Sequence, residues 1–108
     1  MEFSGKKVTV VGTGISGIGA VGLLNAVGAE VVLYDGNEKL KIEDIEKKLG
    51  TYKAEIVLGE LTKELTDSSD LLVISPGVPI DSPVVKAFEA AGVPVWGEVE
   101  LAYAFDKG

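Results

Sequence analysis

A glycine-rich hexapeptide near the start of the chain sets the narrowest limits on its fold. Residues 12–17 read GTGISG, and they stand between a run of β-branched residues at 8–11 and a segment with helical periodicity at 16–27. Short β-branched runs of this kind are typical of strands buried in a parallel sheet. The spacing of the three glycines matches the G-x-G-x-x-G turn that joins such a strand to a helix. We therefore expect a strand, a tight turn and a helix over residues 8–27.

Strand and helix patterns alternate along the whole chain. Runs rich in Val, Ile and Leu predict further strands at 30–34, 55–58, 71–74 and 93–96. Helices are predicted at 16–27, around 42–49, at 82–91 and from about 97 to 105, with one helical turn near 61–65. Crossovers between parallel strands are right-handed almost without exception, so this alternation predicts an α/β fold. We expect one Rossmann-like domain over residues 1–108, a five-stranded parallel sheet of order 3-2-1-4-5 with helices on both faces.

Each predicted helix has a face that should pack on the sheet. The residues expected to face inward are Ile18, Val21, Leu24 or Leu23, Ile42, Ile45, Leu49, Val84, Val85, Phe88 and Ala91. Gly19 and Gly22 lower the helix propensity of the first helix, and a close approach of that helix to the sheet would compensate. Gly28 is expected to end this helix in the left-handed conformation, and Ser82-Pro83 to begin the helix at 82–91.

Composition argues against several classes of function. The chain has 10 basic and 17 acidic residues and a net charge of −7, which argues against a nucleic acid or an anionic membrane surface as its main partner. It has no Cys and no His, so disulfides, thiolate metal sites and the commonest general base are excluded. We expect no catalytic and no metal-binding residue. The composition suits a reducing cytoplasm, and no apolar run reaches the roughly 18 residues of a membrane span.

The turn at residues 12–17 offers a binding site for an anion. Gly12 permits the tight turn, Gly14 lets a diphosphate approach the backbone, and Gly17 lets the helix pack close to the strand. The amides near Ile15 and Ser16 are unpaired in the first helical turn, and the positive end of the helix dipole adds to their attraction for an anion. A tight turn kept only for packing is the alternative interpretation.

Two more predicted loops open at the same edge of the sheet. Asp35 ends the second strand, and Ser75-Pro76-Gly77 follows the fourth. With the strand order above, both loops meet the glycine-rich turn at the topological switch point, where doubly wound sheets bind their ligands. Asp35 either accepts hydrogen bonds from a ribose or a base, or only caps the turn at Gly36. The amides of 75–77 and the Ser75 hydroxyl either close the far wall of the pocket, with Gly77 against a flat base, or form only a rigid turn.

Two acidic residues and a tryptophan near the C-terminus have simpler structural interpretations. Glu98 and Glu100 would lie in the first turn of the last helix, where the helix dipole stabilises carboxylates. This explains them better than a paired-carboxylate site. Trp96 is expected to belong to the core or to cover it partly.

Taken together, these motifs resemble a known family. They are Gly5-Lys6, residues 11–17 (VGTGISG), Asp35, residues 75–79 (SPGVP) and residues 97–101 (GEVEL), and they extend over essentially the whole chain. In their order and spacing they are similar to the N-terminal domain of the Mur ligases of peptidoglycan synthesis, and within that family to the branch that adds D-glutamate.

The resemblance implies that the domain binds the UDP end of UDP-N-acetylmuramoyl-L-alanine rather than NAD. It implies that Ile15 and Ser16 hold the diphosphate, and that Asp35, Gly36 and Gly77 surround the uracil. Some members of the family have a basic residue at the position of Asn37, so the contact with the uracil is expected to be weaker here.

The resemblance also implies a longer enzyme, an ATP-dependent ligase that forms a C–N bond. In the family, ATP, Mg²⁺ and the catalytic residues belong to a central domain, and the D-glutamate site belongs to a C-terminal domain. On this view the chain is an excised domain that is inactive alone and has no cofactor of its own.

Two other functions remain open at this point. A nicotinamide-dependent oxidoreductase would have the same glycines and an acidic residue at Asp35, but no reason for the segments at 75–77 and 97–100. A regulatory nucleotide-sensing module, of the kind attached to ion channels, would bind NADH or an adenine nucleotide and pair through its helices.

Overall fold

Strand and helix alternate along the described chain as predicted. The computed structural model describes residues 3–12, 15–75, 78–79, 81–97, 100–101 and 103, with the backbone alone at Ile15 and Ser16. The elements are β1 (Lys7–Val11), α1 (Ile15–Ala26), β2 (Glu30–Asp35), α2 (Ile42–Leu49), β3 (Glu55–Leu58), α3 (Lys63–Ser68), β4 (Leu71–Ile74), α4 (Pro83–Ala90) and β5 (Val95–Gly97). All strand pairs are parallel, and the order is β3-β2-β1-β4-β5, so the predicted topology is confirmed.

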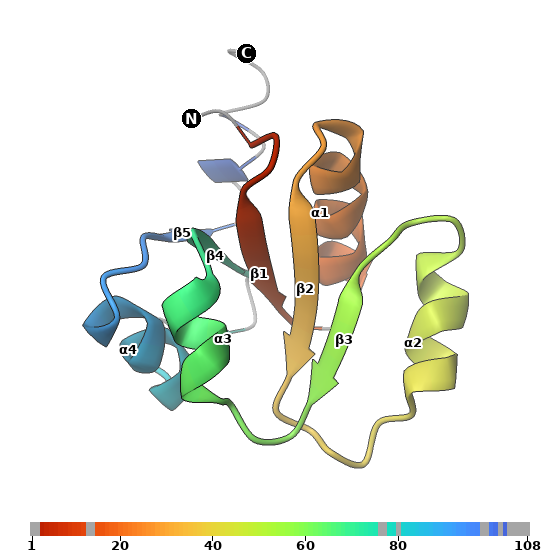
Figure 1. Ribbon diagram of the computed structural model, residues 1–108. Coiled ribbons are helices and arrows are strands. Elements are labelled where there is room, and N and C mark those ends of the chain that lie inside the picture. Colours follow the sequence, from red (N-terminus) through yellow and green to blue (C-terminus); the bar gives the residue numbers. More distant parts are fainter. Residues whose placement is uncertain are drawn as a thin grey trace.

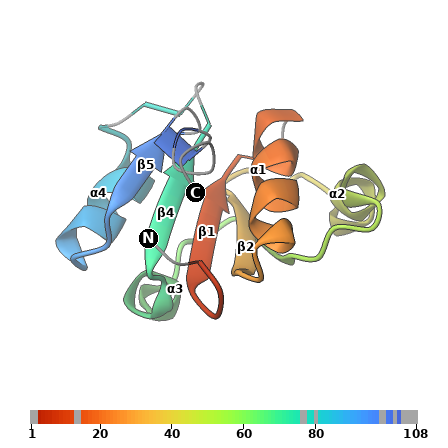
Figure 2. The same ribbon diagram turned by 90° about the horizontal axis from the view of Figure 1, so that it is seen from above.

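Helices cover both faces of the sheet, as Figures 1 and 2 show. On the face covered by α1 and α2, the core contains Val8, Val10, Leu33 and Val73 from the strands. On the face covered by α3 and α4, it contains Val11, Val32, Tyr34, Leu72 and Ile74. Successive strand residues point to opposite faces, which explains why these strands are mainly apolar on both faces.

Both cores are formed within this chain. The Cα radius of gyration is 12.6 Å, close to the roughly 13 Å expected of a compact domain of this length. We therefore expect the chain to fold as a unit.

Most helix ends follow the predicted signals. Gly28, just after α1, has a φ of +79°, as expected of a left-handed cap. Ser82 caps α4 by accepting a hydrogen bond from the Val85 N–H at 3.5 Å, and Pro83 is the first helical residue. The helical turn predicted at 61–65 is instead the longer α3, which is capped by Thr62.

Two residues predicted to face inward do not. Ile42 is 48% exposed, because it lies in the first turn of α2, which stands beyond β3 at the edge of the sheet (Figure 1). Ala91 is exposed because it is the C-cap of α4 rather than part of its buried face. Leu24 and Leu23 were the alternatives for the inward-facing leucine of α1. Leu24 is buried and Leu23 is 41% exposed.

The role predicted for Gly19 and Gly22 is wrong. A Cβ built on Gly19 would meet nothing within 4 Å, so the missing side chain at this position does not bring α1 closer to the sheet. A Cβ on Gly22 would lie 2.7 Å from Cζ of Tyr52, so the space beside this glycine is filled by an aromatic ring from the α2–β3 connection. The pattern of glycines in α1 cannot show which neighbour occupies that space.

Within the described ranges, no helix has the length and apolar character needed to cross a membrane.

Candidate functional site

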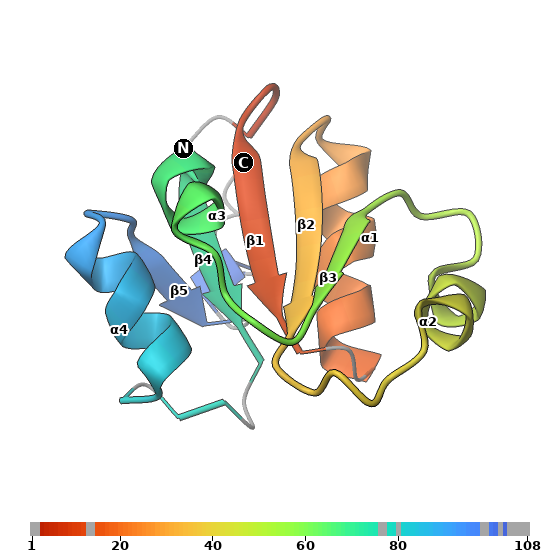
Figure 3. The ribbon, with the colours of Figure 1, turned by 60° about the horizontal axis from the view of Figure 1, so that its bottom comes forward.

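Strand register brings three of the predicted site residues to one edge of the sheet. Val11 pairs with Tyr34 on β2 and with Ile74 on β4. The residues that follow these positions are Gly12, Asp35 and Ser75. Figure 3 shows the carboxyl ends of β1, β2 and β3 at this edge, with the start of α1 beside them. The arrangement is the switch point expected from the strand order, where open α/β sheets bind ligands.

The β1–α1 turn has the close packing that its glycines predict. Gly12 has a φ of +108° and donates its N–H to the carbonyl oxygen of Tyr34 at 2.8 Å. A Cβ on Gly12 would lie 2.9 Å from the Ser75 Oγ, and a Cβ on Gly17 would collide with the carbonyl oxygen of Gly12. The conformational roles predicted for Gly12 and Gly17 are therefore confirmed. Gly14 lies outside the described residues, and ligand contact by this turn stays a prediction.

The first turn of α1 presents backbone amides of the kind that bind anions. α1 begins at Ile15 and has no acidic residue in its first turn. The first N–H groups of a helix have no partner within it, and they carry the positive end of the helix dipole. The edge where Gly12, Asp35 and Ser75 meet therefore also has the backbone donors that bind phosphates at helix N-termini.

Ser75 ties the end of β4 to the end of β1. Its hydroxyl donates to the carbonyl oxygen of Val11 at 3.1 Å, so its proton is already in use and its oxygen can act toward a ligand only as an acceptor. Val78 N–H donates back to the Ser75 carbonyl oxygen at 2.9 Å. Pro76 and Gly77, predicted to line the far wall of the pocket, lie outside the described residues.

Asp35 closes a turn of its own. Its Oδ1 accepts a hydrogen bond from the Asn37 N–H at 3.0 Å, and the Asn37 Oδ1 accepts one from the Lys39 N–H at 3.0 Å. Asp35 thus caps its turn, and whether it does only that stays open. A carboxylate has about four acceptor sites, so capping and ligand contact are compatible. Gly36 and Asn37 are exposed beside it, and contact of these three residues with a ligand stays a prediction.

Sequence reasoning missed Tyr34. Its side chain is buried, and its hydroxyl donates to the carbonyl oxygen of Gly59 at 2.5 Å, which links the end of β2 to the loop after β3. Burial raises the pKa of Tyr34, and the neighbouring carboxylates of Asp35 and Glu60 raise it further. The available signal was an aromatic residue with a hydroxyl in an otherwise apolar stretch of strand, directly before Asp35.

The C-terminal acids behave as the simpler interpretation predicts where they are described. The Glu100 Oε1 accepts a hydrogen bond from the Gly97 N–H at 3.1 Å, which is a helix-start contact. Glu98 lies outside the described residues. Trp96 is partly buried and meets the Phe3 ring edge-on, with ring centroids 6.0 Å apart.

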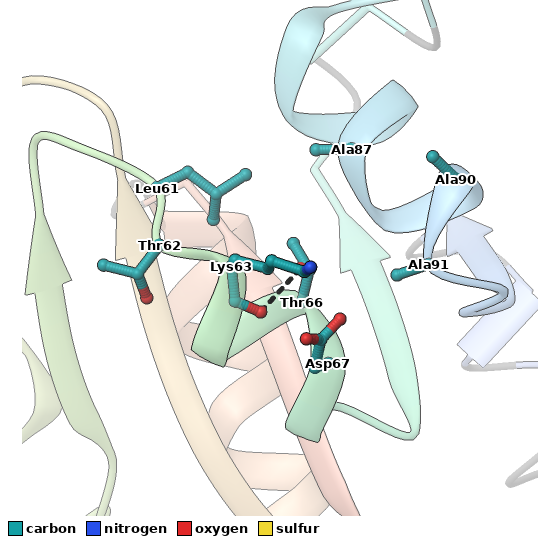
Figure 4. A pocket seen from close by; sticks show the side chains of 8 residues that line it. All are labelled: Leu61, Thr62, Lys63, Thr66, Asp67, Ala87, Ala90 and Ala91. Atoms are coloured by element: carbon teal, nitrogen blue, oxygen red, sulfur yellow. Dashed lines mark hydrogen bonds between the residues drawn. The ribbon is translucent and has the colours of Figure 1, made fainter.

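A hollow elsewhere on the surface does not involve the predicted site residues. A groove of about 400 Å³ lies between α3 and α4, and its lining residues are Leu61, Thr62, Lys63, Thr66, Asp67, Ala87, Ala90 and Ala91 (Figure 4). The Thr66 hydroxyl is used within α3, where it donates to the Lys63 carbonyl oxygen at 2.8 Å. Size does not single out this groove, since another hollow, beside Asn25 and Lys53, has a volume of about 480 Å³, whereas the convergence of strand ends and helix amides favours the edge at Gly12. We give more weight to the convergence, because it supplies directed hydrogen-bond donors.

In the described ranges, no three acidic side chains are grouped as they would be around a metal ion.

Comparison with known proteins gives similarity over almost the whole chain. The family described as "Mur ligase MurD-like, N-terminal domain" matches residues 6–97. A UDP-N-acetylmuramoylalanine--D-glutamate ligase from Lachnospira eligens is 63% identical over all 108 residues, and the chain spans 24% of that relative's length.

Two solved structures share the fold at lower identity. A pseudomurein peptide ligase type C from Methanothermus fervidus has a TM-score of 0.69 at 22% identity, covering 89% of this chain and 20% of that one. A shikimate dehydrogenase from Aquifex aeolicus has a TM-score of 0.62 at 15% identity, covering 94% of this chain and 45% of that one. At these identities the likeness concerns the fold alone.

Proposed function

The chain belongs to the MurD-like N-terminal domain family of the Mur ligases, and from this premise we propose that it binds the UDP moiety of UDP-N-acetylmuramoyl-L-alanine. The observation that carries the proposal is the edge where Gly12, Asp35 and Ser75 meet beside the first turn of α1. One ligand with a diphosphate at one end and a nucleoside at the other matches this combination of backbone donors and a carboxylate.

The diphosphate end is assigned to the β1–α1 turn. The net charge of −7 repels anions at long range, so the ligand has to be held by donors in direct contact with it. Backbone amides at residues 15–17 are such donors, and Gly14 would let the diphosphate approach the backbone. The family resemblance gives Ile15 and Ser16 this role.

The nucleoside end is assigned to the loops after β2 and β4. Asp35 can accept a hydrogen bond from a uracil N–H or a ribose hydroxyl, and Gly36, Asn37 and residues 75–77 would surround the base. Asn37 carries no charge, so its contact with the base relies on its amide and on the turn geometry that it shares with Asp35.

The activity of a longer enzyme is part of the proposal. The chain spans about a quarter (24%) of the length of the relative that is 63% identical to it, and that relative is named as a ligase that adds D-glutamate. We propose that the chain is the substrate-holding domain of such a cytoplasmic, ATP-dependent ligase. ATP and Mg²⁺ would bind the central domain of that enzyme and D-glutamate its C-terminal domain, so the 108-residue chain alone should hydrolyse no ATP.

The proposal is tested by titrating the isotope-labelled chain with UDP, UMP, NADH and AMP in separate NMR experiments. We expect UDP to shift the amides of Ile15, Ser16, Gly36 and Gly77, and UMP to shift fewer of those in the β1–α1 turn. A preference for NADH or AMP would contradict the proposal and favour the oxidoreductase or nucleotide-sensing alternative.

A charge-reversal variant tests the phosphate contact separately. Ser16→Asp places a carboxylate in the first turn of α1, where it would repel the diphosphate, so UDP binding should be lost. Because an acidic residue at this position is itself favourable for a helix, the fold should remain intact. Unchanged UDP affinity would remove the β1–α1 turn from the site.

A further inference from the structure

Gly59, the residue after β3, is tied to the end of β2 through both of its backbone polar groups. Its N–H donates to the carbonyl oxygen of Asp35 at 2.9 Å, and its carbonyl oxygen accepts the hydrogen bond from the Tyr34 hydroxyl at 2.5 Å. The strands pair in register up to this point, with Asp35 opposite Leu58. The backbone of Asp35 is therefore held by hydrogen bonds to the residue that follows the neighbouring strand, β3.

The backbone conformation at the position of Gly59 favours glycine over other residues. Its φ is +87°, which side-chain-bearing residues rarely adopt, and a Cβ built on it would lie 3.2 Å from the Cβ of Glu38. Glu38 belongs to the loop that follows β2 and also contains Asn37. The loop beside the candidate acid thus packs directly on Gly59.

Two sets of hydrogen bonds contribute to the position of the Asp35 carboxylate. The bond from the Asn37 N–H to Oδ1 orients the carboxylate relative to its own backbone. The bonds through Gly59 locate that backbone relative to the sheet. Side chains preorganised in this way lose less freedom when a ligand binds.

We propose that Tyr34 is a positioning residue for the nucleoside end of the site, and that it acts by holding Gly59 and, through it, the backbone of Asp35. Its own side chain is 3% exposed and takes part in a protein hydrogen bond, so Tyr34 does not contact the ligand. The inference rests on the proposed function, because it assigns a role within the same site.

The phenol remains a donor across the neutral pH range. Burial and the carboxylates of Asp35 and Glu60 raise the pKa of Tyr34, so the proton stays on the hydroxyl. This supports the geometric argument, since the carbonyl oxygen of Gly59 can only accept.

The test compares the affinities of the wild-type chain and of Tyr34→Phe for UDP and ADP by calorimetry. The variant keeps the ring and removes only the hydroxyl. We expect UDP affinity to fall about fivefold, as for the net loss of one hydrogen bond, while ADP affinity stays near the wild-type value. The reason is that the β1–α1 turn, which holds the diphosphate of both ligands, bonds to the backbone carbonyl oxygen of Tyr34, which the variant keeps, and not to the hydroxyl or to Gly59. General loosening of the fold would weaken both ligands alike and leave the UDP-to-ADP ratio unchanged.

A second variant and a control complete the experiment. Gly59→Ala should also lower the ratio of UDP affinity to ADP affinity, because Ala rarely adopts a φ of +87° and its Cβ would crowd Glu38. Tyr52→Phe removes the hydroxyl of a tyrosine that is 44% exposed beside α1, and it should change neither affinity. NMR spectra without ligand should show shifted amides at 36–40 in Tyr34→Phe and unchanged ones in the second half of α1.

The possible outcomes separate this inference from the proposed function. A folded Tyr34→Phe protein with the wild-type UDP-to-ADP ratio would overturn the role of Tyr34 and leave UDP binding intact. A wild-type chain that binds ADP as well as UDP would remove the proposed function, and the role of Tyr34 with it.

Discussion

Thr9 and Ser69 form a buried polar pair between the middle of β1 and the end of α3. Their hydroxyl oxygens are 2.7 Å apart, and the Ser69 Oγ also donates to the Leu65 carbonyl oxygen at 2.8 Å. Since the Ser69 proton is used in that second bond, Thr9 must be the donor in the first. Removal of one hydroxyl should therefore affect stability more than removal of the other. A buried donor left without an acceptor costs more free energy than an acceptor that loses one donor.

This inequality gives a stability prediction. Ser69→Ala leaves the Thr9 hydroxyl without its acceptor and should reduce the free energy of unfolding by about 1–3 kcal/mol. Thr9→Val removes the donor and keeps the side-chain shape, so its cost should be smaller. Urea unfolding of both single variants and of the double variant measures the coupling. A larger loss for Thr9→Val would mean that the donor has been assigned the wrong way round.

The raised pKa of Tyr34 predicts a dependence of stability on pH. Its pKa lies above the ordinary value of 10.0, because burial and the carboxylates of Asp35 and Glu60 disfavour the phenolate. The folded state therefore holds its proton more tightly than the unfolded state, and this contribution is complete below pH 10 and falls as pH rises through the raised pKa. Urea midpoints measured from about pH 8 to about pH 11 should fall less steeply in Tyr34→Phe than in the wild type. Parallel curves would contradict the shift.

At the scale of one element, α1 contains glycines with opposite surroundings. A Cβ on Gly17 would collide with the Gly12 carbonyl oxygen, whereas one on Gly19 would meet nothing within 4 Å. The same chemical change therefore has opposite expected effects two residues apart. Comparing the two positions separates two contributions to stability: the packing of α1 against the β1–α1 turn, and the helix propensity of the residue itself.

The matched pair is Gly17→Ala and Gly19→Ala. Gly17→Ala should displace the start of α1, lower the unfolding free energy and weaken UDP binding, because the amides of the first turn would move. Gly19→Ala should stabilise the chain by about 0.5–1 kcal/mol, the usual gain of Ala over Gly in a helix, and leave binding unchanged. Urea unfolding and UDP titration measure both effects. Equal effects from the two variants would show that α1 is not packed on Gly12 as described.

At the scale of the whole molecule, the acidic charge distinguishes backbone-mediated anion binding from binding by a basic patch. The net charge is −7, so no attraction at long range assists a diphosphate. Sites built from lysines and arginines lose affinity as salt screens them. A site built from amides and a helix N-terminus depends on contacts too short for screening to remove.

Salt therefore tests the origin of the affinity. Between about 50 and about 300 mM NaCl, the Kd for UDP should change by no more than about twofold, since screening also reduces the repulsion by the protein's own charge. Titration calorimetry at several salt concentrations measures it. A steep loss of affinity would point to lysine side chains as the main donors.

Local patterns were sufficient for the topology and for the β1–α1 turn. Buried strands, capped helices and right-handed crossovers leave few possible strand orders, and the predicted order is the one observed. Gly12 and Gly17 were assigned from their spacing alone, because a tight strand-to-helix turn has few solutions for its backbone. The Asx turn at Asp35 and the caps of α4 are likewise contacts between residues close in the chain.

Contacts between distant segments were decided only by the tertiary structure. The ring of Tyr52 beside Gly22, the exposure of Ile42, and the bond from Tyr34 to Gly59 depend on how elements far apart in the chain pack together. Periodicity reports which face of a helix is apolar, and it carries no information about which neighbour occupies that face. The amino-acid sequence thus determined the strand order and which strand ends meet at the candidate site, while packing between elements determined how Asp35 is held there.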